Sequence, residues 1–182
     1  MSTTLVLLAI ALHAVSGLPQ LFLRMRGERI AAALAVIGSV LGLAGAGEVF
    51  VSGETTFLSI EWSIPGAAFH VGVDELSAVF LLSVFLIALL GTIYSLEYWK
   101  QSEHTSNAPK MRFFHGLMTA AMALLTIAQN GILFLMAWEV MALSVYFLVT
   151  TESDKPEVRE AGWIYFVATH TGTLMLFAMF AL

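Results

Sequence analysis

Long apolar blocks alternate with short polar linkers along this chain of 182 residues. A helix that crosses a bilayer needs about 20 consecutive, mostly apolar residues. The pattern predicts about six such helices, at roughly residues 3–23, 30–51, 76–98, 113–128, 132–150 and 161–182. We therefore expect an all-α polytopic membrane protein with a single transmembrane domain over residues 1–182.

The linker between the second and third blocks breaks the helical pattern. Polar and apolar residues alternate from Phe57 to Ile64, and Pro65 and Gly66 then mark a turn. Alternation on both sides of a turn is typical of a β-hairpin. The sequence therefore predicts a short hairpin at about 56–73, in the loop between the second and third helices.

The basic residues indicate how the helices are oriented. If the six blocks cross the bilayer in alternation, every lysine and arginine falls on one side: Arg24, Arg26, Arg29, Lys100, Lys110, Arg112, Lys155 and Arg159. By the positive-inside rule that side is cytoplasmic, so we expect the inner (cytoplasmic) membrane and an N-terminus outside. No basic residue precedes the first block, which favours a retained helix over a cleaved signal peptide.

The composition excludes several classes of protein. The chain is 59% hydrophobic and 12% charged, whereas soluble domains are about 25% charged. This leaves no room for a large soluble catalytic domain. The absence of cysteine removes disulfides and thiolate ligands, and a chain with 8 lysines and arginines and no strong basic cluster is not expected to bind nucleic acid. We predict no metal and no cofactor.

Glu139 is the candidate functional residue that the pattern singles out, because it lies well inside the fifth apolar block. A carboxylate at that depth costs roughly 2.5–3.5 kcal/mol on insertion scales, and such residues usually face a bundle interior and mark ion or proton pathways. We predict that Glu139 transfers protons. The alternative is a structural carboxyl group that bonds to a neighbouring helix.

His170 lies in the middle of the sixth block and is the second candidate for proton transfer. Its imidazole titrates near neutral pH, although a histidine among threonines is also typical of a hydrogen bond between helices. Four further residues are candidate accessory polar groups: His13, His115, Ser144 and Thr171.

The order of these features resembles a known family. The predicted hairpin leads into Asp74-Glu75-Leu76-Ser77, and Trp138-Glu139 follows in the fifth block. In this order the chain resembles the antiporter-like, proton-conducting membrane subunits of respiratory complex I, Mrp-type sodium/proton antiporters and membrane-bound hydrogenases. Its nearest branch resembles hydrogenase-4 component B and formate hydrogenlyase subunit 3.

The resemblance implies a role for Glu139 and a set of partners. In that family the glutamate of the fifth helix pairs with a lysine on a later helix, but this chain has no lysine inside any apolar block. The chain is therefore expected to be the N-terminal part of such a subunit. The implied partners are other membrane subunits, including whichever supplies the lysine, redox subunits, and the lipid bilayer.

Three functions remain open from the sequence. The first is a membrane subunit, or an N-terminal fragment of one, in a proton-translocating respiratory or hydrogenase complex. It would be a non-catalytic subunit that couples redox chemistry in its partners to proton transfer through the buried carboxylate. The second is a non-conducting structural or assembly subunit, and the third is a stand-alone cation/proton antiporter.

Overall fold

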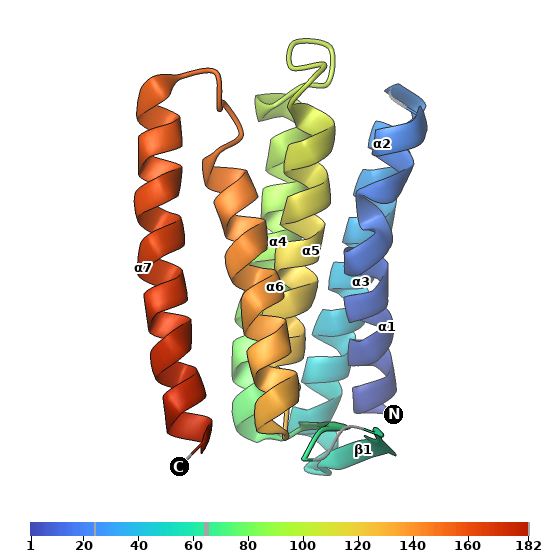
Figure 1. The fold of residues 1–182 in the computed structure, drawn as a ribbon. Coiled ribbons are helices and arrows are strands. Elements are labelled where there is room, and N and C mark those ends of the chain that lie inside the picture. The colour runs from blue at the N-terminus through green and yellow to red at the C-terminus, as the bar shows by residue number, and fades with distance from the viewer. Residues whose placement is uncertain (24, 64–65, 182) are drawn as a thin grey trace.

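The computed structural model describes residues 1–23, 25–63 and 66–181, so Arg24, Ile64, Pro65 and Leu182 lie outside the described residues. Within them the chain forms a bundle of helices with a small sheet at one end (Figure 1). The helices are α1 (Ser2–Ser16), α2 (Leu18–Leu23), α3 (Met25–Ser52), α4 (Glu75–Tyr98), α5 (Ala108–Ile127), α6 (Gly131–Val149) and α7 (Pro156–Ala181). The prediction of an all-α polytopic membrane protein with a short hairpin is confirmed.

Most of the long helices are suited to a bilayer. In the part of the chain that the structure describes, 5 segments are long and apolar enough to cross a membrane: Ser2–Leu23, Arg26–Ser52, Glu75–Tyr98, Gly131–Val149 and Pro156–Phe180. The remaining long helix, α5, has 20 residues and carries Lys110 and Arg112 near its start. We expected about six spans. Five segments meet the criteria of length and hydropathy, and α5 is the sixth long helix.

The first apolar block is not one continuous helix, because it breaks at Gly17 between α1 and α2. The backbone of Phe113 in α5 lies so close to Gly17 that a Cβ atom there would collide with it. Pro19 follows, and proline within a helix removes an N–H donor and clashes with the carbonyl four residues earlier. These two constraints explain why the block is divided.

Three helices begin earlier than the hydrophobic pattern predicts. Arg26 and Arg29, which we expected in a linker, belong to α3. Pro109, which we expected to act as a helix breaker, lies in the first turn of α5, and Pro156 opens α7. Proline is well tolerated there because the first N–H groups of a helix have no partner within the helix.

The predicted hairpin is confirmed. Strands β1 (Thr56–Glu61) and β2 (Ala68–Val73) are antiparallel, with Thr56 opposite Val73. The Thr3 hydroxyl of α1 donates to the Thr56 carbonyl at 2.7 Å. The Gln129 N–H donates to the carbonyl of His70 at 2.8 Å. A two-stranded hairpin is marginal alone, so these bonds to the helices hold it in place.

The two ends of the bundle differ. The hairpin, the α5–α6 turn and both chain ends lie at one end, whereas the α4–α5 and α6–α7 linkers lie at the other (Figure 1). The described lysines and arginines lie in these linkers or near the starts of α3, α5 and α7, at this second end, which we call the basic end. The core between the ends includes Val6, Ala46, Phe85 and Ile127, all fully buried.

The start of α4 offers a first test. Asp74 caps this helix, and its carboxylate accepts from the Ser77 N–H at 2.7 Å. We expect Asp74→Ala to lower the free energy of unfolding by about 1 kcal/mol, the usual cost of losing such a cap. Asp74→Asn, which keeps an acceptor, should have little effect. Denaturant titration in mixed micelles measures both, and equal losses would contradict the cap.

The same cap predicts a pH dependence. The hydrogen bond from the Ser77 backbone lowers the pKa of Asp74 below its usual value of 3.8. A depressed carboxyl pKa contributes stability that is full above the unfolded pKa and is lost as the pH falls through the folded pKa. The stability difference between Asp74 and Asp74→Ala proteins should therefore be constant near neutral pH and shrink only below about pH 4.

Candidate proton-transfer site

Glu139 and His170 face each other across the interface between α6 and α7. The Nε2 atom of His170 lies 3.5 Å from Oε2 of Glu139. Their side chains are 29% exposed for Glu139 and 36% for His170, so both are partly covered by the bundle. The structure thus brings together the two residues that the sequence singled out separately.

The backbone of α7 sets the tautomer of His170. Its Nδ1 atom lies 3.0 Å from the carbonyl oxygen of Phe166, and a carbonyl oxygen only accepts, so Nδ1 carries the hydrogen. When the imidazole is neutral, Nε2 has a lone pair that points to Glu139. The pair is therefore favourable in two forms, an imidazolium with a carboxylate or a neutral imidazole with a carboxylic acid. The two forms differ only in which of the two residues holds one proton.

A further feature of the site is the other carboxylate oxygen of Glu139. Its Oε1 atom is buried and has no hydrogen-bond partner among the described residues. A buried polar atom normally has a partner, and an unpaired carboxylate oxygen at membrane depth is costly. This oxygen therefore marks the side of the site where a further group is expected to bind.

A second polar contact joins α6 and α7 beside the first. The indole N–H of Trp138 donates to the hydroxyl oxygen of Thr173 at 3.1 Å, and that hydroxyl donates to the Thr169 carbonyl at 3.1 Å. Trp138 precedes Glu139, and Thr173 lies three residues after His170, so the two contacts are neighbours on the same interface. The ring of Phe166 also packs on His170, with centroids 4.0 Å apart.

The four accessory candidates do not join this pair. The hydroxyls of Ser144 and Thr171 donate to carbonyls of their own helices, at 2.7 and 2.8 Å. His13 is fully buried and shares a hydrogen bond of 3.1 Å with Ser39 across α1 and α3. His115 lines a cavity near the basic end instead. Any role of these four in proton transfer stays a prediction.

A buried ion pair joins α5 to α3 near the basic end. Arg112 Nη2 lies 2.7 Å from Glu28 Oε1, and the side chains are 7% and 17% exposed. The same nitrogen donates to the Trp99 carbonyl at 3.1 Å. We had placed both charged residues in linkers. Pro109 could have indicated that the helix starts before Phe113, because proline is favoured in the first turn, but no local pattern pairs Arg112 with Glu28.

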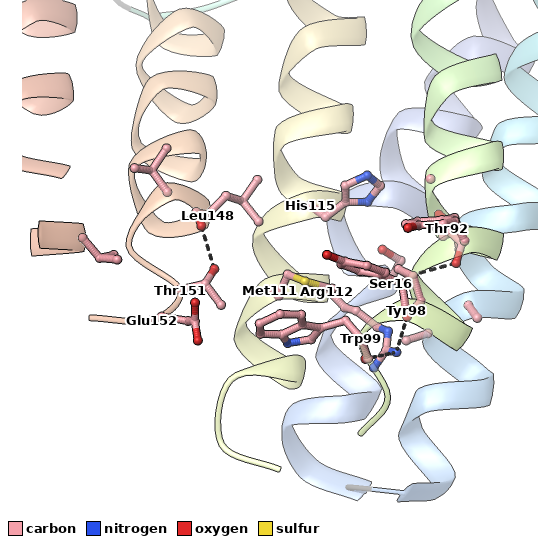
Figure 2. Close-up of a pocket in the computed structure, with 18 residues that line it drawn as sticks. Ser16, Thr92, Tyr98, Trp99, Met111, Arg112, His115, Leu148, Thr151 and Glu152 are labelled. Atoms are coloured by element: carbon pink, nitrogen blue, oxygen red, sulfur yellow. Dashed lines mark hydrogen bonds between the residues drawn. The ribbon is translucent and has the colours of Figure 1, made fainter. Parts of the chain in front are cut away.

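A cavity of about 510 Å³ lies beside Arg112 of this ion pair (Figure 2). It is lined by parts of six helices and includes Thr92, Trp99, Arg112 and His115. Neither Glu139 nor His170 lines it. The proton-transfer pair and the cavity are therefore separate features.

Comparison with known proteins agrees with the fold. Residues 128–182, which include α6 and α7, match the family described as NADH:quinone oxidoreductase/Mrp antiporter, TM. Hydrogenase-4 component B of Escherichia coli is 29% identical over 96% of this chain and 26% of that protein. A probable inorganic carbon transporter subunit, DabB1, of Halothiobacillus neapolitanus is 29% identical over 87% of this chain and 28% of that protein.

A third relative is a dehydrogenase subunit. The F(420)H(2) dehydrogenase subunit L of Methanosarcina mazei is 32% identical over 57% of this chain and 15% of that protein. The chain spans at most about a quarter of the length of these curated relatives.

The apolar helices and the hairpin define a multi-pass membrane protein. The matches agree on a family: residues 128–182 match the NADH:quinone oxidoreductase and Mrp antiporter family, and the relatives that cover more of the chain support the same assignment. The resemblance predicted from the sequence is confirmed, and hydrogenase-4 component B is among the relatives.

The Trp138–Thr173 bond gives a testable prediction. Thr173→Val removes the acceptor of a partly buried indole N–H, so we expect the free energy of unfolding to fall by about 1 kcal/mol. Thr173→Ser keeps the hydroxyl and should restore most of this loss. Unfolding of both variants in mixed micelles, followed by tryptophan fluorescence, measures the difference. Similar losses in both would show that the methyl group matters rather than the bond.

Proposed function

We propose that this chain is a membrane subunit, or the N-terminal part of one, that transfers protons in a respiratory or hydrogenase-type complex. Redox chemistry would take place in partner subunits, and the carboxyl group of Glu139 would respond to it. The observation that carries the proposal is the Glu139–His170 contact of 3.5 Å between two apolar helices. Polar ionisable groups at this depth usually mark proton pathways.

The chemistry of the pair supports proton exchange. Burial disfavours a lone carboxylate, and a neighbouring cation favours it. A protonated His170 stabilises the carboxylate of Glu139, whereas loss of charge on either side favours the neutral pair. Since Nδ1 of His170 is held by the Phe166 carbonyl, the proton moves between Nε2 and Oε2 without a rotation of the ring.

The orphaned Oε1 atom of Glu139 supports the need for another group. We propose that a cationic side chain from outside residues 1–182 approaches this oxygen, as the lysine of the family would. A change in charge or conformation in the partner subunits would move this cation. Its withdrawal raises the affinity of Glu139 for a proton, and its approach lowers it.

The membrane placement follows from the distribution of charge. The described basic residues lie at one end of the bundle, and the positive-inside rule places that end in the cytoplasm. We therefore propose an inner-membrane protein with the hairpin and the N-terminus outside. The partners would be other membrane subunits, redox subunits and the surrounding lipid.

The central test is Glu139→Gln in the full-length protein within its native complex. We expect proton translocation to be lost while the complex still assembles, because glutamine keeps the shape of the side chain and cannot exchange a proton. Proton uptake into sealed vesicles and the subunit composition of the purified complex are the two measurements. Glu97→Gln is the matched control, since Glu97 is exposed at the end of α4.

The same test separates the alternative functions. Normal proton translocation in the Glu139→Gln complex would contradict the proposal and favour a non-conducting structural subunit. Proton flux that depends on a cation, in liposomes that contain only this chain, would instead favour a stand-alone antiporter.

The second residue of the pair gives a further prediction. His170→Gln removes the proton acceptor beside Glu139, and we expect the rate of proton translocation to fall by about 10²-fold or more, the scale of a lost acid–base group. His70→Gln is the matched control, because it makes the same change at a histidine of β2, outside the α6–α7 interface. A rate unchanged by His170→Gln would remove the histidine from the pathway.

A further inference from the structure

The cavity near the basic end has walls of two kinds. One wall is the small-residue surface of α3, with Ala31, Ala32 and Ala35. Another part of the lining is the end of α4, with Tyr94, Tyr98 and the C-cap residue Trp99. Tyrosine and tryptophan are enriched where a membrane meets water, at the level of the lipid headgroups. The cavity therefore combines an apolar surface with an aromatic rim typical of that depth.

Unpaired hydrogen-bond donors gather at this cavity (Figure 2). The hydroxyl of Thr92, the indole N–H of Trp99, and Nε and Nη1 of Arg112 are buried without a hydrogen-bond partner within the described residues. Arg112 as a whole is only 8% exposed. Guanidinium and indole groups can donate but cannot accept. The unpaired atoms of Trp99 and Arg112 therefore require acceptors, and a ligand with several acceptor oxygens would satisfy them.

The nearby carboxylates already have partners. Glu28 binds Nη2 of Arg112 at 2.7 Å, and Glu152, which lines the cavity, binds Lys155 at 2.9 Å. Neither supplies an acceptor to the unpaired donors. The volume of about 510 Å³ is also far larger than the roughly 30 Å³ that one bridging water occupies. Water alone would leave the apolar wall of α3 wet.

We propose that this cavity binds a phospholipid from the surrounding leaflet. The phosphodiester oxygens accept hydrogen bonds from Arg112 and Trp99, and one acyl chain lies along Ala31, Ala32 and Ala35. A free phosphate ion would satisfy the donors but not cover the apolar wall, whereas a lipid does both. This inference does not depend on proton transfer by Glu139.

A pair of lipid probes tests the proposal in the full-length protein within its complex, reconstituted in phosphatidylcholine vesicles. One probe is phosphatidylglycerol with a diazirine on its acyl chain, and the other is a diacylglycerol with the same chain but no phosphate. We expect the first probe to label residues 31–35 and 91–99, and the second to label them much less. Inorganic phosphate should not compete with the labelling.

Three results would overturn the proposal. Equal labelling by both probes would show that the phosphate is not recognised. Competition by inorganic phosphate would show an ion site rather than a lipid site. Labelling confined to the outer faces of the bundle would show that another protein segment or water fills the cavity.

Variants then test the donors. Trp99→Phe keeps the ring that stacks on His104 but removes the N–H, so we expect the probe concentration for half-maximal labelling to rise about fivefold, the scale of one lost hydrogen bond. Arg112→Gln should raise it further, and the exposed Lys110→Gln is its matched control.

Because Arg112 also binds Glu28, the Arg112 variant can fail to fold. Ala35→Leu is therefore a second variant that tests the site without Arg112, since it fills the cavity and removes no charge. Unchanged labelling in both Trp99→Phe and Ala35→Leu proteins would contradict the site.

Discussion

The structure depends on one constraint: the hydrocarbon core of a bilayer offers no water to a polar group, so each such group must find its partner inside the protein. Short hydroxyl side chains meet this constraint within their own helix, as Ser144 and Thr171 do. Longer polar side chains can also reach across to a neighbouring helix. The bond between His13 and Ser39 joins α1 to α3 in this way, and two polar contacts join α6 to α7.

The importance of these contacts differs along the bundle. Helices α1, α3, α4 and α5 approach closely, with Gly17 against the backbone of Phe113 and Gly42 against the ring of Phe85. Dispersion contacts hold that part together. Helix α7 is largely exposed and packs on α6, so the polar contacts contribute a larger share of the energy that positions it. The groups proposed to exchange a proton therefore also help to dock the helix that carries one of them.

Local patterns in the sequence predict what is local in the structure. The long apolar runs predicted the helices, and alternation around a turn predicted the hairpin. The break at Gly17 was predictable only in part, because Pro19 is visible in the sequence, whereas the close contact of Gly17 with α5, almost a hundred residues later, is not. Glu139 and His170 stood out one by one as polar residues in apolar runs, but only the packing of α6 on α7 brings them together. Glu28 and Arg112 were missed because each lies in a polar stretch, where a charge gives no signal.

The two ion pairs illustrate why burial alone does not identify a proton-transfer group. Arg112 is more deeply buried than Glu139, but its guanidinium binds Glu28 and the Trp99 carbonyl, and an arginine does not lose its proton in proteins. That pair has a fixed charge and ties α5 to α3. Glu139 instead has one contact of 3.5 Å and a second oxygen without a partner in the described chain. A carboxyl group held this loosely, next to an imidazole whose other nitrogen is already bonded, has two protonation states that differ little in contacts. The pair with fewer bonds is thus the one to which we assign the proposed exchange of a proton.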